Sequence, residues 1–521
     1  MKNKKIYLLL LLVIIISIFF RFYNFYQLQY WSGDEEIASA VVRRMIVDRK
    51  IALISPNATI ASSLGSFFHL ISVPLFLISS LNPVYVLLLM GVYGVVTSIL
   101  LFQIGKQVKD ERLGFIISFL YSSSFLMGLF DRRWWPLSLN PFLTTLAIYS
   151  LLKIILNKQY FYSIFLAIAV GFAGHADPSL TVIFVATVIA FMYFKIKLLK
   201  KENLLGVIVL LMFIAPLLIF EVRHQGTIFA PLAKAFERTT TITGTKDLRL
   251  INPDMAICTF TRLFFPRPSQ FAENNFCYCP LYDSPLMPNI TKIITLLLIL
   301  LPLYHLFKNN NSKQKSFLIL LYIFIFAFTI GSILFSLSYN NAFHQHYFTV
   351  IFPVIFLLAG YSIYKLTKKN NFFLYLILSL YFVINSYALV TSSFRYPLSD
   401  KNKLVLEIIK NLNNKNFSLY VAGDAYFHGG GFTGLFVLNN KHPKKSYIYP
   451  FYDWMYRSHS LYTVSPESTD QELVVIIGPS IRYNFPQQKI IFNKKLPNLE
   501  GIVLDNSNYW FNEKMLENIP Y

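Results

Sequence analysis

Twelve apolar runs separated by short polar segments occupy the first three quarters of this 521-residue chain, and they constrain its fold more than any other feature. Most of the runs are close to the about 20 residues that a helix needs to cross a bilayer. They lie near 6–20, 64–81, 84–104, 113–130, 137–156, 160–174, 178–197, 204–222, 290–307, 316–338, 347–366 and 372–393. The pattern predicts an all-α polytopic membrane domain.

The composition agrees with this prediction and excludes other classes of protein. Apolar residues make up 55% of the chain and charged residues only 14%, whereas soluble domains average about 25% charged residues. An ordinary soluble enzyme is therefore excluded, and 50 Phe with 33 Tyr exclude a disordered chain. The net charge of +21 is unusual, but with this hydropathy it does not indicate a nucleic-acid partner.

The distribution of lysine predicts the orientation in the membrane. The basic segments 195–201, 308–315 and 365–369 are assigned to the cytoplasm by the positive-inside rule. The first apolar run follows Lys2, Lys4 and Lys5 and precedes no small-residue cleavage site, which indicates an uncleaved first span with a cytoplasmic N-terminus.

The same rule places the loops 223–289 and 339–347 and the C-terminal tail after residue 394 outside the cytoplasm. Twelve crossings would instead return the tail to the cytoplasm. We therefore expect 11 or 13 transmembrane helices, with 64–81 and 160–174 the runs least certain to cross.

Two domains are expected. Residues 1–395 form the membrane domain, with outer loops at about 23–63 and 223–289, and residues 398–521 form a soluble extracytoplasmic α/β domain. Within the second domain the patterns predict a helix over 403–415 and strands over 418–422, 435–438, 473–477 and 489–492.

The most informative polar stretch is Trp31-Ser32-Gly33-Asp34-Glu35-Glu36, which follows the first span closely and so lies at the outer surface of the membrane. One interpretation is a helix start, with Asp34 as the N-cap and acids in the first turn. The other interpretation makes Asp34 a catalytic base at membrane level.

On these residues the sequence resembles the membrane glycosyltransferases of the GT-C class, and most closely the family-39-type enzymes, the protein O-mannosyltransferase and aminoarabinose-transferase group. Those enzymes carry an Asp-Glu pair after the first helix, and Asp34-Glu35 match it in place and order. Three other stretches resemble the same group in layout: 131–136 with Asn140-Pro141, 220–224, and 344–348. In the last stretch His stands where the family often has Arg.

The resemblance implies a GT-C fold and an inverting transferase that moves a sugar from a polyprenyl-phosphate donor to an acceptor hydroxyl, with no cofactor and no metal. Asp34 would be the base and Glu35 would orient it or the acceptor. The expected substrate-binding residues are Glu36, Arg132, Arg133, Arg223, His224, His344, His346 and Tyr347. The expected setting is the plasma membrane and cell envelope, with a mannosyltransferase-like reaction outside the cytoplasm and a protein, lipid or glycan as acceptor.

Each cation also has a purely structural interpretation. Arg132 and Arg133 stand beside Trp134 and Trp135, a pattern typical of an interfacial anchor. Arg223 and His224 end an apolar helix, where cations interact with the last carbonyls. Arg262 and Arg267 are further candidate cations that are equally suited to loop packing, and the spacing of His344 and His346 disfavours a metal pair.

Three remaining features stay open. Cys258 pairs with Cys277 or Cys279 only if that stretch is extracytoplasmic. The segment 429–434 satisfies G-x-G-x-x-G, but a glycine loop fits better than a dinucleotide site. The alternative function is a polytopic transporter or flippase, against which stand the outer position of the ionisable residues and the lack of an internal repeat.

Overall fold

The computed structural model is mostly helical with a small C-terminal sheet, which confirms the predicted combination of a helical membrane part and an α/β tail. It describes residues 2–57, 63–197, 200–224, 226, 230, 253–267, 269–272, 287–308, 311–338, 345–413, 415–421, 430–446, 472–478 and 486–507. Within these residues six helices are long and apolar enough to cross a membrane, and five shorter apolar segments accompany them. The chain is therefore a multi-pass membrane protein.

The helical part runs from α1 to α17. Its helices are α1 (Lys2–Phe22), α2 (Gly33–Val47), α3 (Phe67–Leu70), α4 (Val73–Ile78), α5 (Val84–Val108), α6 (Glu111–Ser122), α7 (Phe125–Phe130), α8 (Asn140–Asn157), α9 (Ser163–Gly171), α10 (Thr181–Tyr193), α11 (Lys201–Arg223), α13 (Pro253–Phe264), α14 (Met287–Lys308), α15 (Ser312–Ser338), α16 (Phe352–Leu366) and α17 (Asn371–Thr391). Short 3-10 turns include η1 (Pro136–Leu139) and η6 (Gln345–Val350), and β1 (Ile54–Asn57) pairs with β2 (Ser63–Gly65).

Burial separates a central helix from peripheral ones. Helix α16 is buried over almost its whole length and packs against α6, α8 and α14. Helices α11 and α14 are as apolar but bury few of their side chains, and Met212 and Leu297, for example, are 65% and 62% exposed. Apolar faces of this size are stable beside lipid and not beside water. These helices therefore form the lipid-facing wall of the bundle.

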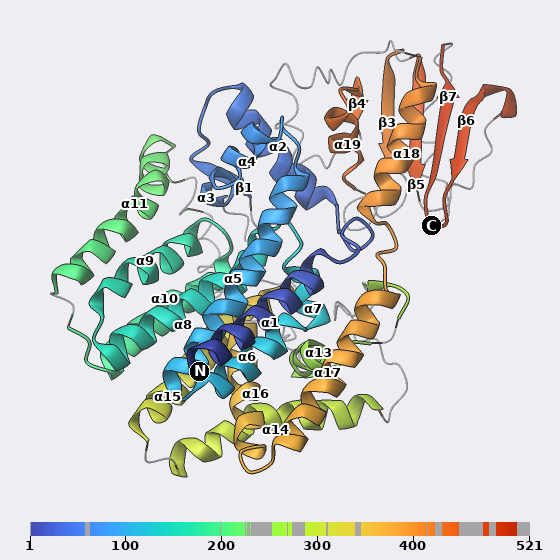
Figure 1. Cartoon of the computed structure of the whole chain (residues 1–521). Coiled ribbons are helices and arrows are strands. Elements are labelled where there is room, and N and C mark those ends of the chain that lie inside the picture. The colour runs from blue at the N-terminus through green and yellow to red at the C-terminus, as the bar shows by residue number, and fades with distance from the viewer. Residues whose placement is uncertain are drawn as a thin grey trace.

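The run 64–81 begins in β2, and its only helices are the short α3 and α4, which pack beside α2. At 1.5 Å per residue the two helices together span less than 20 Å, whereas the hydrocarbon core is about 30 Å thick. In Figure 1 they lie with α2 and the C-terminal sheet at one end of the bundle, and the N-terminus of α1 lies toward the other end.

The C-terminal part is a five-stranded sheet with two helices. Its elements are α18 (Leu398–Asn411), β3 (Phe417–Val421), α19 (Phe432–Leu438), β4 (Lys445–Ser446), β5 (Leu473–Gly478), β6 (Ile490–Lys495) and β7 (Glu500–Asp505). The strand order is β4-β3-β5-β7-β6, parallel from β4 to β5 and antiparallel beyond.

Three of the predicted strands are confirmed, but the one over 435–438 is wrong. These residues belong to helix α19, which ends there. An apolar run of four residues carries no periodicity that separates a strand from a buried helical turn. The predicted helix over 403–415 begins earlier, at Leu398 directly after Pro397, and β4 and β7 were not expected.

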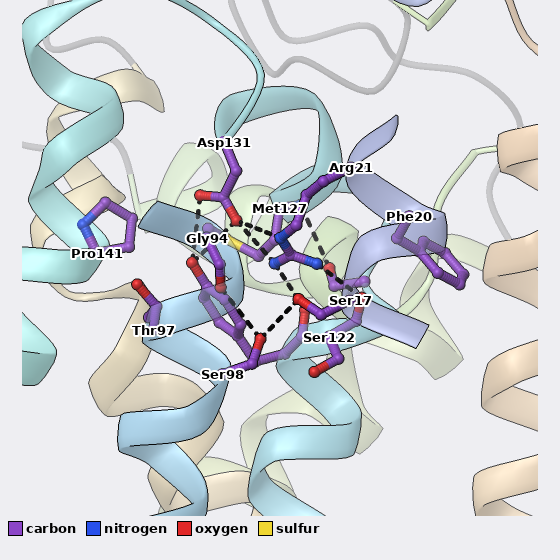
Figure 2. Close-up of polar contacts among 12 residues, drawn as sticks. Ser17, Phe20, Arg21, Gly94, Thr97, Ser98, Ser122, Met127, Asp131 and Pro141 are labelled. Carbon is purple, nitrogen blue, oxygen red and sulfur yellow. Dashed lines mark hydrogen bonds and ion pairs between the residues drawn. The ribbon is translucent and has the colours of Figure 1, made fainter. Parts of the chain in front are cut away.

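A buried polar network fixes the end of α1 inside the bundle (Figure 2). Arg21 is fully buried and pairs with Asp131 at 2.7 Å, and it also donates to the carbonyl oxygen of Ser122 at 2.8 Å. The hydroxyl of Tyr121 donates to the same carboxylate at 3.0 Å. Every charge in this network has a partner, which is the condition for burying charges at tolerable cost. The residue after α7, Asp131, is thereby held against α1.

Gly94 of α5 gives this network its space. A Cβ there would lie 2.5 Å from both Arg21 Nε and Asp131 Oδ2. Gly94→Ala is therefore expected to lower the free energy of unfolding by about 1–3 kcal/mol, the usual cost of overpacking. Gly331→Ala, where among the described residues the new Cβ meets only Val182 at 3.7 Å, is the matched control. Thermal unfolding in detergent compares the two, and equal midpoints would contradict the tight packing around Arg21.

Candidate active site

The acidic stretch after α1 forms the first turn of helix α2. Ser32 is the N-cap, and the Glu35 carboxylate accepts hydrogen bonds from the Ser32 N–H at 3.0 Å and the Ser32 hydroxyl at 2.7 Å. This Ser-x-x-Glu arrangement is a capping box. The expectation that Asp34 caps the helix is wrong because Ser32 occupies that position. Asp34 lies inside the first turn, and its side chain is 32% exposed.

Arg133 brings the two acids together. Its Nε donates to Glu35 Oε1 at 2.9 Å, and its second terminal nitrogen lies 3.7 Å from Asp34 Oδ2. The guanidinium also lies between two rings, 4.3 Å from the centroid of Tyr30 and 4.2 Å from that of Trp135. Cation–π contacts and ion pairing together hold a side chain that is only 5% exposed. We name Asp34, Glu35 and Arg133 the acid–arginine cluster.

The electrostatics of Asp34 suit a base that works near neutral pH. Burial, and secondly the charge of Glu35, raise the pKa of Asp34 to about 6, and the charge of Arg133 opposes this rise. A carboxylate with this pKa is ionised at pH 7 and is more basic than an ordinary aspartate. Its partial exposure leaves it open to a reactant, whereas Glu35 is fully buried.

Adjacent arginines have different partners. The guanidinium of Arg132 is buried and donates to the carbonyl oxygens of Phe20 and Tyr23 at 2.9 Å each. These groups belong to the end of α1, where carbonyls lack partners within the helix. Asp131 pairs with Arg21, which also belongs to α1. The segment 131–133 therefore ties the end of α1 to the start of α2.

The short helix η6 lies next to the acid–arginine cluster, because it contacts Trp135 through an aromatic ring. His346 of η6 packs edge-on against Trp135 with the ring centroids 4.9 Å apart, and Tyr347 is buried beside it. On its other side η6 contacts α13 through Phe348 and Phe260, at 5.5 Å. His344 lies outside the described residues.

The acid–arginine cluster does not include three other expected site residues, Glu36, Arg223 and His224. The Glu36 carboxylate accepts hydrogen bonds from the N–H groups of Gly431 and Gly434 in the C-terminal part. Arg223 and His224 are exposed at the end of α11, where His224 stacks on Phe220 at 3.9 Å. Helix α11 packs on α9 and on β1 and β2.

Two further arginines stand on and after α13. Arg262 and Arg267 are half-buried. Burial, and then the charge of Arg267, lower the pKa of Arg262, which places two coupled cations in one region. Cys258 of the same helix is disulfide-bonded, and Cys277 and Cys279 lie outside the described residues. Among the residues described, no three His, Cys, Asp or Glu side chains gather as metal ligands.

Tyr30 and Trp135 are parts of the site that sequence reasoning did not single out. The signal for Trp135 was present, because it follows Arg133 by two residues in a stretch already noted for its polar break. Tyr30 precedes the acidic stretch by four residues, and only the fold shows that its ring meets Arg133.

No protein-family model and no curated protein sequence matches the chain. Solved structures do. ArnT from Cupriavidus metallidurans, bound to undecaprenyl phosphate, is similar at a TM-score of 0.57 and 10% identity over 96% of this chain and 98% of that one. The same protein in its apo state gives a TM-score of 0.55. AglB, the archaeal oligosaccharyltransferase from Archaeoglobus fulgidus, gives 0.46 at 14% identity over 91% of this chain and 69% of that one.

The match to ArnT spans almost the whole of both chains and establishes the fold. ArnT is a GT-C glycosyltransferase, so the GT-C fold expected from the resemblance at Asp34-Glu35 is confirmed. At 10% identity the match shows architecture alone.

Proposed function

We propose that this protein is an inverting glycosyltransferase that moves a sugar from a polyprenyl-phosphate donor to an acceptor hydroxyl at the outer face of the plasma membrane. One observation carries the proposal: the acid–arginine cluster joins a partly exposed, more basic aspartate to a buried arginine at one end of a bundle with the ArnT fold. The fold supports a donor of this chemistry, because ArnT is bound to undecaprenyl phosphate.

In this reaction Asp34 accepts the proton of the acceptor hydroxyl. The acceptor oxygen attacks the anomeric carbon from the face opposite the phosphate, and the bond from that carbon to the phosphate oxygen breaks. The electron pair stays on the phosphate, and the configuration at the anomeric carbon inverts. Glu35 and Arg133 hold Asp34 in place, because Arg133 contacts both carboxylates. The acceptor is a protein, lipid or glycan hydroxyl.

The leaving phosphate requires cations, because negative charge develops on its oxygens. Arg133 and Arg132 hold the cluster and the end of α1 through a carboxylate and backbone carbonyls. Arg262 and Arg267 have mutually repelling charges in a half-buried region, and a phosphate would relieve that repulsion. We assign the donor phosphate to these two arginines. His346 packs on Trp135, and Tyr347 lies beside it on the same turn as Phe348, which contacts α13. His346 and Tyr347 are the proposed sugar contacts.

For the topology we propose 11 crossings, with α3 and α4 as an outer surface element. An odd number puts the C-terminal domain opposite the cytoplasmic N-terminus. The disulfide of Cys258 supports an outer position for α13, because structural disulfides persist in oxidising compartments. Labelling Lys109 and Lys197 with an impermeant amine reagent tests the assignment, since both must stay protected in intact cells.

The donor assignment is tested by lipid binding. Native mass spectrometry of the purified protein is expected to show undecaprenyl phosphate bound and undecaprenol, which lacks the phosphate, not bound. Arg262→Gln and Arg267→Gln should each weaken the complex about tenfold or more, since each removes one charge-assisted contact. Arg223→Gln, which alters an exposed cation on α11, is the matched control. Weakening by Arg223→Gln alone would overturn the assignment to α13.

Transfer itself is followed as release of undecaprenyl phosphate from a set of undecaprenyl-phosphate-linked hexoses and pentoses, with a membrane extract of the source cells as acceptor. Turnover of one donor identifies the sugar. Failure of every donor, in a protein that still unfolds cooperatively, would contradict the proposed activity.

A further inference from the structure

Glu36 joins the site helix to the C-terminal domain. Glu36 is 8% exposed, and its carboxylate accepts hydrogen bonds from the N–H of Gly431 at 3.0 Å and from the N–H of Gly434. Both donors stand at the start of α19. The first turn of α2, which carries Asp34, is therefore bonded to the first turn of a helix in the other domain.

A lysine and a tryptophan complete this contact. Lys401 of α18 donates to the carbonyl oxygens of Trp31 at 2.6 Å and Gly430 at 2.7 Å, and the indole N–H of Trp31 donates to the Gly431 carbonyl at 2.9 Å. Lys401 and Trp31 are each 1% exposed. The interdomain clasp consists of Trp31, Glu36, Lys401, Gly430, Gly431 and Gly434.

The clasp accounts for the glycine-rich segment. Gly431 has a φ of +91°, which favours glycine, and a Cβ there would lie 2.6 Å from the indole nitrogen of Trp31. In a dinucleotide-binding loop the N–H groups of the glycine turn would bind phosphate. Here the Glu36 carboxylate occupies two of them, so the segment binds a side chain of its own chain.

The clasp and Arg133 hold opposite faces of α2. Glu36 follows Asp34 by two residues, which corresponds to about 200° around a helix with 3.6 residues per turn. Asp34 therefore faces Arg133 while Glu36 faces α19. Farther along α2, Val41 and Met45 pack with Val437 of α19. A shift of the C-terminal domain would rotate α2 and carry Asp34 with it.

We propose that Glu36 and Lys401 are positioning residues, through which the C-terminal domain holds α2 so that Asp34 faces the reactants. The catalytic part of this proposal rests on the proposed function, whereas the holding of α2 does not. Glu36 then acts through its helix and makes no contact with substrate.

The first test needs no substrate. Hydrogen–deuterium exchange of the full-length protein in nanodiscs compares Glu36→Gln, which changes the α2 side of the clasp, with Gly431→Ala, whose new Cβ crowds Trp31 from the C-terminal side. Backbone amides of α2 are expected to exchange at least about tenfold faster in both variants. Glu407→Gln, in an exposed pair with Lys410 on α18, should match the wild type. Unchanged exchange in both clasp variants would overturn the holding of α2.

The second test separates positioning from substrate binding by the release assay. Both clasp variants are expected to lose about 10–100-fold in kcat, with KM for the lipid-linked sugar within about twofold of wild type. A raised KM with unchanged kcat in Glu36→Gln alone would overturn positioning and make Glu36 a substrate contact. A wild-type protein without turnover overturns the proposed function and the catalytic role of the clasp, while the exchange result still decides whether the domain holds α2.

Discussion

Asp34→Asn is expected to reduce transfer by about 10²–10⁴-fold, the contribution of a positioned general base. Asparagine keeps the size of the side chain but cannot accept the acceptor proton. Because the site keeps its shape, undecaprenyl phosphate should bind to the variant as it does to wild type. Release of undecaprenyl phosphate and native mass spectrometry measure the two properties separately.

The pH dependence gives the same residue a second test. Asp34 must be ionised to act as a base, and its pKa is raised to about 6. Wild-type kcat/KM, which reports the ionisation of the free enzyme, should therefore fall as the pH drops through about 6. The control is Asp48→Asn at the other end of α2, where Asp48 pairs with Arg44 at 3.2 Å, and it should keep the wild-type profile. Wild-type turnover in Asp34→Asn would exclude Asp34 as the base.

Arg133→Met is expected to lower both activity and stability. It leaves the fully buried Glu35 without its cation, and breaking a buried ion pair costs about 3–5 kcal/mol. The charge of Arg133 also lowers the pKa of Asp34. Without it that pKa rises, so the acidic limb of the kcat/KM profile should move to higher pH. Thermal unfolding and the pH profile of the variant measure the two effects.

Arg133→Lys separates charge from shape. Lysine keeps the positive charge, so the pH profile should move little. It lacks the planar group that lies between Tyr30 and Trp135 while bonding Glu35, so part of the stability loss should remain. If the pH profile of Arg133→Met kept the acidic limb at the wild-type pH, Arg133 would not set the basicity of Asp34.

The sequence predicted the helical architecture and the place of the acids, because these depend on local patterns. Apolar runs of bilayer length indicate membrane helices wherever they occur, and Asp34 follows the first run closely. The Ser32-x-x-Glu35 pattern also predicts a helix start at Ser32, although Asp34 was expected there. These features needed no knowledge of which helices are neighbours.

The partners of the site residues could not be predicted, because they depend on contacts between distant segments. Glu36 and Gly431 are 395 positions apart, and no local pattern links them. Arg132 and Arg133 are adjacent cations beside tryptophans, yet one bonds α1 and the other bonds α2. Their roles differ because the chain after α7 directs one side chain to α1 and the next to α2. The role of the half-buried Arg262 likewise depends on how α13 packs.

The partners of segment 131–133 also limit how chains of this architecture can diverge. Asp131 and Arg132 bond the end of α1, and Arg133 reaches α2. Inserting or deleting one residue here would exchange the side chains that face the two helices. Variation in length is therefore expected in the outer loops, where neither helix depends on it, and this tripeptide should be inherited as a unit of fixed length. Transplanting the acids into another helical bundle would require moving the tripeptide and the end of α1 with them.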